Sequence, residues 1–89
     1  MSESAYQRKL IKQYESEGWT VLRLRDAPTS VAQTGTPDLL VMRPWDTKGV
    51  AEVKFIEVKN TGGKVSKLQE VHMRLLTERG FECEVNYKQ

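Results

Sequence analysis

The 89-residue chain is 38% hydrophobic and 29% charged, which fits one globular domain, spanning residues 1–89, with a modest core. Its formal charge of +2 is mildly basic and does not by itself indicate nucleic acid. A single cysteine and a single histidine exclude a structural zinc site of the usual kinds, and no apolar run is long enough to cross a membrane. Because Cys83 cannot form an internal disulfide and the N-terminus lacks a signal-peptide core, we expect a cytoplasmic protein.

The N-terminal part of the chain predicts a helix, a strand and a long loop. Residues 2–18 repeat apolar side chains at helical spacing and end at a glycine, with either Ser2 or Ser4 as the N-cap. Residues 19–25 have the composition of a strand. The polar residues 26–36 form a loop whose length is typical of functional segments.

The C-terminal part predicts two strands, a helix and a last strand. Residues 37–43 and 50–59 form a hairpin, residues 66–80 a second helix, and residues 81–87 the final strand. The order is α-β-β-β-α-β, an α/β fold with a small mixed sheet flanked by helices. The predicted core positions on the two helices are Tyr6, Leu10, Leu68, Val71 and Leu75.

Charged residues interrupt the two hairpin strands where a buried strand should not carry them. Asp38 opens one strand, and Glu57 and Lys59 point to the same face near the end of the other. Burying these charges is costly unless something compensates them, and a divalent cation does so, with the Val58 carbonyl as a further oxygen ligand. A metal beside a lysine is what phosphodiester hydrolysis requires. The alternative is that Asp38 is a turn residue and Glu57–Lys59 a surface ion pair.

Three motifs in the chain resemble one nuclease family. Residues 35–40 (Gly-Thr-Pro-Asp-Leu-Leu), residues 55–59 (Phe-Ile-Glu-Val-Lys) and the pattern Ser66-x-x-Gln69-x-x-His72 resemble the VRR-NUC (virus-type replication-repair nuclease) domain of the PD-(D/E)xK superfamily. The resemblance covers nearly the whole chain and implies a restriction-endonuclease-like core, standing alone as in phages. It also implies an Mg2+- or Mn2+-dependent endodeoxyribonuclease that leaves 5′-phosphate and 3′-hydroxyl ends.

The resemblance assigns roles to four residues of the predicted site. Asp38 and Glu57 are metal ligands and catalytic residues, and Lys59 is the catalytic lysine. Gln69 is a further catalytic residue that orients the lysine, water or a phosphate. Ser66-x-x-Gln69 is also a capping box, so a site role and a cap role for the glutamine both remain open.

Further residues of the two helices take roles by the same resemblance. Glu3 matches an acidic residue of the first helix that binds or positions metal, and Glu15 and Glu17 compete for that role. His72 shares a helical face with the catalytic glutamine. Related families carry an aromatic residue at the position of Met73, so their Gln-x-x-x-Tyr pattern does not carry over.

The expected substrate is DNA, held largely by its phosphates. The residues predicted to contact DNA are Arg23, Arg25, Lys64 and Lys67. Trp45 is either a DNA contact or a cover for the edge of the core. Branched DNA, with Holliday junctions first, is the preferred substrate, cut by a symmetric homodimer in a phage or bacterial cell. The alternatives are a nuclease that nicks or restricts ordinary duplex, and a non-catalytic DNA-binding module on the same fold.

Overall fold

The computed structural model describes residues 2–24, 35–44 and 51–88. Its elements are α1 (Glu3–Ser16), β1 (Thr20–Arg23), β2 (Leu39–Pro44), β3 (Ala51–Lys59), α2 (Lys67–Glu78) and β4 (Glu82–Tyr87). This is the predicted order, and each element begins and ends within two residues of its predicted bounds. In the described ranges, neither helix combines the length and apolarity needed to span a membrane.

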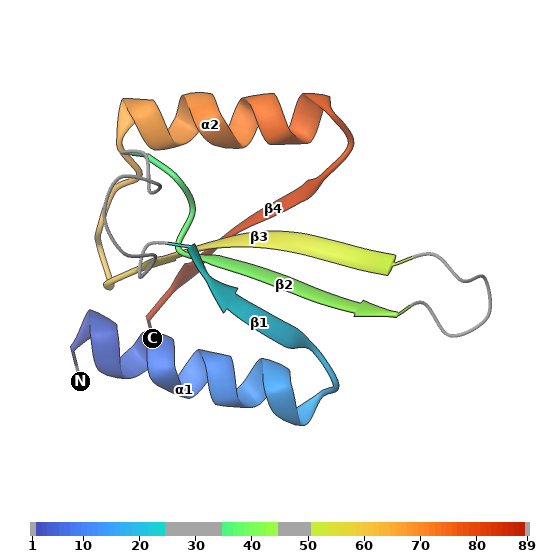
Figure 1. Ribbon diagram of the computed structural model, residues 1–89. Helices are drawn as coiled ribbons and strands as arrows, with labels where there is room; N and C mark the ends of the chain where they lie inside the picture. The colour runs from blue at the N-terminus through green and yellow to red at the C-terminus, as the bar shows by residue number, and fades with distance from the viewer. Residues whose placement is uncertain (1, 25–34, 45–50, 89) are drawn as a thin grey trace.

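The four strands form one mixed sheet in the order β1-β2-β3-β4. β2 is antiparallel to both β1 and β3, and Leu39 pairs with Ile56, so the predicted hairpin is confirmed. β4 runs parallel to β3, as the intervening helix α2 requires. Figure 1 shows α1 on one face of the sheet and α2 on the other. The first turns of both helices and the end of β3 lie at the same end of the molecule.

The main hydrophobic core lies between α1 and the sheet. Its buried residues are Leu10, Ile11, Trp19, Leu39, Val41, Ile56 and Val58. Side chains of a strand alternate between its faces, so Ile56 and Val58 enter this core while Glu57 points to the α2 side. Tyr6 packs against the core, as predicted.

Polar contacts tie α1 and β3 to the edge strand β4. Nζ of Lys54 lies 3.2 Å from Glu82 Oε2 and 3.5 Å from Glu84 Oε1. The Tyr14 hydroxyl donates to Glu84 Oε2 at 3.2 Å. Burial lowers the pKa of Lys54, but the hydrogen bond to Glu82 and the charge of Glu84 outweigh it and leave that pKa raised. Burial raises the pKa of Tyr14, and Glu84 raises it further.

The prediction that Leu68, Val71 and Leu75 belong to the core is wrong. These side chains are 43–44% exposed and form a stripe along α2, called here the α2 stripe. Successive helix residues turn by about 100°, so the stripe is rotated by about 100–160° from Gln69, which is the helix's buried residue. The helix therefore turns a glutamine toward the sheet, with the half-buried Leu76 on the same inward side.

Candidate functional site

Three buried polar side chains meet at the end of the sheet where β3 stops. Asp38 immediately precedes β2, Glu57 lies near the end of β3, and Gln69 lies in the first turn of α2. Their exposed fractions are 7%, 1% and 5%. Because Leu39 pairs with Ile56, Asp38 and Glu57 are the next residues along their antiparallel strands. The hairpin thus brings the two predicted carboxylates together.

Backbone contacts hold Asp38 between its two neighbouring strands. The Val58 N–H donates to Asp38 Oδ2 at 2.9 Å, which ties this carboxylate to β3 directly after Glu57. The Leu24 N–H donates to the Asp38 carbonyl at 2.8 Å, which ties the same residue to the end of β1. Asp38 is therefore more than a turn residue, because its side chain spans to the strand that carries Glu57.

The buried Glu57 carboxylate is compensated by two donors on one of its oxygens. Gln69 Nε2 donates to Glu57 Oε2, and Lys59 Nζ lies 3.2 Å from the same oxygen. The Lys59 side chain is 18% exposed and that of Glu57 is 1% exposed. This pair is not the surface ion pair of the alternative interpretation, because a carboxylate so deeply buried needs such donors to remain charged.

Gln69 caps its own helix and also contacts the Glu57 carboxylate of the candidate site. Its Oε1 accepts from the Ser66 N–H at 2.9 Å, and its own N–H donates to Ser66 Oγ at 3.1 Å, which completes the capping box of α2. Its Nε2 donates to Glu57 at the same time. A carboxamide has an acceptor oxygen and a donor nitrogen, so this one side chain caps the helix and holds the Glu57 carboxylate at the same time.

Gly35 allows the short segment of residues 35–37, which leads into Asp38, to approach α2 closely. Gly35 has a φ of +91°, and a Cβ there would lie 2.7 Å from Leu68 Cγ and 3.2 Å from His72 Nδ1. Both the positive φ and this close approach favour glycine. His72 therefore lies against the Gly-Thr-Pro-Asp segment, and α2 positions both sides of the site.

Comparison with known proteins identifies the family. The model of the VRR-NUC domain matches residues 4–88. The chain belongs to the VRR-NUC family. A solved structure titled "VRR_NUC domain" is 25% identical and matches with a TM-score of 0.76, over 97% of this chain and 84% of that one. A Fanconi-associated nuclease 1 homolog from Oryza sativa subsp. japonica is 38% identical over 52 residues, which is 58% of this chain and 5% of that protein.

The VRR-NUC family is a family of nuclease domains, and the resemblance inferred from residues 35–40, 55–59 and the Ser-x-x-Gln-x-x-His pattern is confirmed. The chain spans about one-twentieth of the length of the rice relative that it matches.

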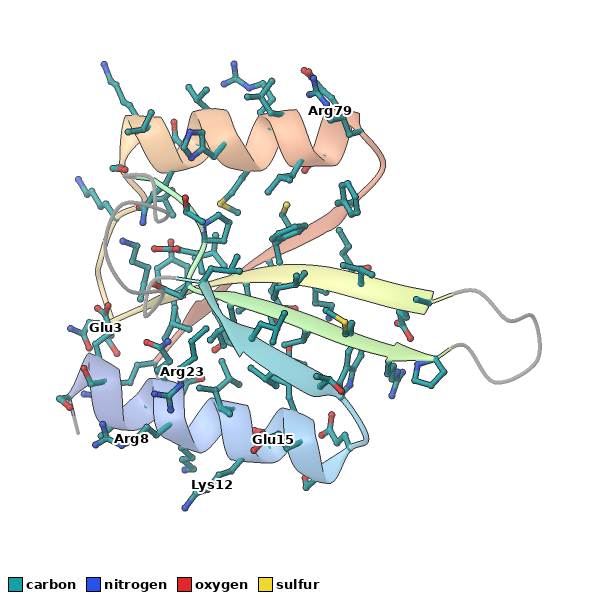
Figure 2. The ribbon with its side chains drawn as sticks, viewed as in Figure 1. Glu3, Arg8, Lys12, Glu15, Arg23 and Arg79 are labelled. Carbon is teal, nitrogen blue, oxygen red and sulfur yellow. The ribbon has the colours of Figure 1, made fainter. Side chains whose placement is uncertain are left out.

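In this VRR-NUC domain the first helix begins at the same end of the molecule as the site. Ser2 is its N-cap, since Ser2 Oγ accepts from the Ala5 N–H at 3.1 Å, and Glu3 occupies the first turn (Figure 2). Across the described ranges, no three or more His, Cys, Asp or Glu side chains gather as a metal cluster. Glu3 therefore does not complete a cluster with Asp38 and Glu57.

The competing acids of the first helix lie farther from the site. Glu15 lies in the last turn of α1 and Glu17 is its C-cap, while the site lies beside the first turn. Neither residue is therefore placed to share a metal ion with Asp38 and Glu57.

The residues predicted to contact DNA are distributed around the site end. Arg23 is the last residue of β1 and pairs with Leu39, the residue that follows Asp38. Lys64 is an exposed residue of the connection before α2, and Lys67 is the exposed first residue of that helix. Arg25 and Trp45, which were also singled out, lie outside the described residues.

The donor set of this VRR-NUC domain fits a hard divalent cation. Asp38 and Glu57 offer two carboxylates on adjacent strands, and Mg2+ is commonly held by one or two carboxylates with water in its other positions. The absence of cysteine and histidine from this pair fits Mg2+ or Mn2+ rather than a softer metal. A ligand role for the Val58 carbonyl stays a prediction.

Proposed function

We propose that this VRR-NUC domain is a metal-dependent DNA endonuclease that hydrolyses phosphodiesters at Asp38, Glu57, Lys59 and Gln69. One observation carries the proposal: the buried Glu57 carboxylate is held by Lys59 and Gln69 at the point where Asp38 joins the same strand pair. Membership of a nuclease family supports this chemistry.

The proposed chemistry divides between a cation and the chain's own residues. Asp38 and Glu57 would hold Mg2+ or Mn2+, which would supply Lewis acidity when bound. The Lys59 ammonium stabilises the negative charge that develops on the phosphate oxygens in the transition state. Gln69 keeps Glu57 oriented, and the Val58 N–H does the same for Asp38. The products carry 5′-phosphate and 3′-hydroxyl ends.

The proposed substrate is branched DNA, with four-way junctions first. An 89-residue domain has little surface for reading bases, so recognition by shape and phosphates is expected. The exposed α2 stripe is apolar and continuous along one side of a helix, which suits self-complementary pairing of two copies. A homodimer would present two sites to the two strands of a symmetric junction. We expect it to act in the cytoplasm of a phage-infected or bacterial cell.

Cleavage of a labelled four-way junction and a matched linear duplex tests this function. Each substrate is incubated with Mg2+, Mn2+ or EDTA, and we expect metal-dependent cutting of the junction in preference to the duplex. Failure to cut either substrate with either metal would leave a DNA-binding module as the function. Equal cutting of both would refute the junction preference but not the nuclease. Light scattering at micromolar concentration tests the homodimer.

A further inference from the structure

A groove of about 470 Å³ runs between α1 and the edge strand β1, on the outside of the molecule. It is called here the α1–β1 groove. Ile11 and Val21 form part of its apolar lining, and Arg8, Lys12 and Arg23 contribute its basic side chains. These three basic residues are exposed. The groove therefore offers an apolar floor with cationic side chains around it.

The charge of the groove is concentrated toward the candidate site. Three cationic side chains face one carboxylate, that of Glu15, so the groove lining carries a net +2 at neutral pH. This equals the formal charge of the whole chain. Figure 2 shows Arg8, Lys12 and Arg23 nearer the first turn of α1, and Glu15 farther along the helix. An anion would be attracted to the end of the groove that is close to the site.

The groove and the site share the end of β1. Arg23 pairs with Leu39, the residue after Asp38, and the Leu24 N–H donates to the Asp38 carbonyl at 2.8 Å. A polymer that reaches Asp38 from this side therefore passes Arg23 and then enters the groove along α1. Because the groove continues from the candidate site, one DNA strand could occupy both.

We propose that the α1–β1 groove binds the sugar–phosphate backbone of the DNA strand that extends away from the site. This proposal rests on the proposed function. Arg8 and Lys12 are about one helical turn, about 6 Å, apart, a spacing that lets the two side chains meet neighbouring phosphates of one strand. Apolar side chains such as Leu22, 46% exposed, offer nothing to hydrogen-bond base edges. Binding is therefore independent of base sequence and sensitive to salt.

The test compares two double variants that remove the same charge. The groove variant, Arg8→Gln/Lys12→Gln, removes two positively charged side chains from the groove lining. The control variant, Lys9→Gln/Arg74→Gln, removes two exposed positively charged side chains that lie outside it. Affinity for a fluorescent four-way junction is measured by anisotropy in EDTA, over a series of salt concentrations. Each phosphate contact contributes about 0.9 to the slope of log K against log salt. We expect the groove variant to lose about 1.8 from this slope and to bind about 60-fold more weakly at 0.1 M salt.

The control variant should stay within about threefold of the wild type, and a charge-conserving Arg8→Lys/Lys12→Arg variant should keep the wild-type slope. A groove variant that matches the control would overturn the proposal. Because binding is measured without metal, the two proposals fail separately. If the groove variant shows the expected loss of slope but the wild type never cuts DNA, the proposed nuclease function is refuted and the groove proposal stands. If the wild type cuts DNA but the groove variant binds it normally, the groove proposal is refuted and the nuclease function stands. A wild type that does not bind DNA refutes both.

Discussion

Replacing Gln69 by methionine tests the double role of its carboxamide. Methionine is close in volume and apolar, so it fills the buried position but can neither accept from the Ser66 N–H nor donate to Glu57. The backbone N–H of residue 69 still reaches Ser66 Oγ, so part of the cap survives. Ser66→Ala is the matched control, because it removes that remaining part of the cap and leaves the carboxamide in contact with Glu57.

The two substitutions differ in expected cost. A hydrogen bond to a charged group contributes about 1.5–3 kcal/mol and one between neutral groups about 1 kcal/mol, so Gln69→Met should lower the free energy of unfolding by about 2.5–4 kcal/mol. Ser66→Ala should cost about 1 kcal/mol. In a domain of this size 1 kcal/mol shifts the Tm by about 4–8 °C. Gln69→Met should therefore melt more than 10 °C below the wild type, and Ser66→Ala less than 10 °C below it.

Thermal unfolding of both variants in EDTA, followed by circular dichroism, measures this difference without metal or substrate. A third variant, Gln69→Glu, keeps an acceptor for the Ser66 N–H but sets a second carboxylate against Glu57, so its stability should improve as the pH falls and the two share a proton. If Gln69→Met melts at the same temperature as Ser66→Ala, the contact with Glu57 contributes nothing and the reasoning is refuted.

Three other outcomes are expected. Lys59→Ala should lower kcat by at least about 100-fold in the junction assay while junction binding in EDTA persists; loss of binding as well would make the lysine structural. In the wild type, Mn2+ at about 100 times its Kd should stabilise the fold by about 2.7 kcal/mol, and Asp38→Asn should abolish most of that Tm shift; an equal shift in both proteins would contradict a site at Asp38. Because the pKa of Lys54 is raised above its ordinary 10.5, its ion pairs with Glu82 and Glu84 stabilise the fold fully below pH 10.5 and are lost as the pH rises through the higher folded value. The Tm difference between wild type and Lys54→Met should shrink above that pH, and a constant difference would contradict the assignment.

The sequence was sufficient to predict the order of elements and the meeting of Asp38 with Glu57. Glycine and proline mark the boundaries of short elements, and a hairpin needs only local information to bring its two strands together. Strand alternation also separates Glu57 from the core residues beside it. These features depend on near neighbours in the chain, which is why they could be predicted.

The orientation of α2 could not be predicted in the same way. Periodicity identifies the α2 stripe, and the usual expectation turns such a stripe inward. The helix instead buries Gln69, whose carboxamide meets a carboxylate from β3 and the backbone of its own cap. The energy of those contacts depends on the tertiary fold, which local spacing does not contain. Arg8 and Lys12 were overlooked for a related reason, because in sequence they resemble any solvated side of a helix.

The unequal packing of the two faces of the sheet has a consequence for local unfolding. The core between α1 and the sheet holds seven buried apolar residues, whereas Gln69 is the buried residue of α2. Regions with few buried apolar contacts open first in native proteins. The Glu57 carboxylate is thus held in part by the helix with fewer buried apolar residues, so opening of α2 would remove the Gln69 donor and leave Lys59 of β3 in place. The core beneath α1 would stay folded during such opening, and the contact between Gln69 and Glu57 would form and break with α2.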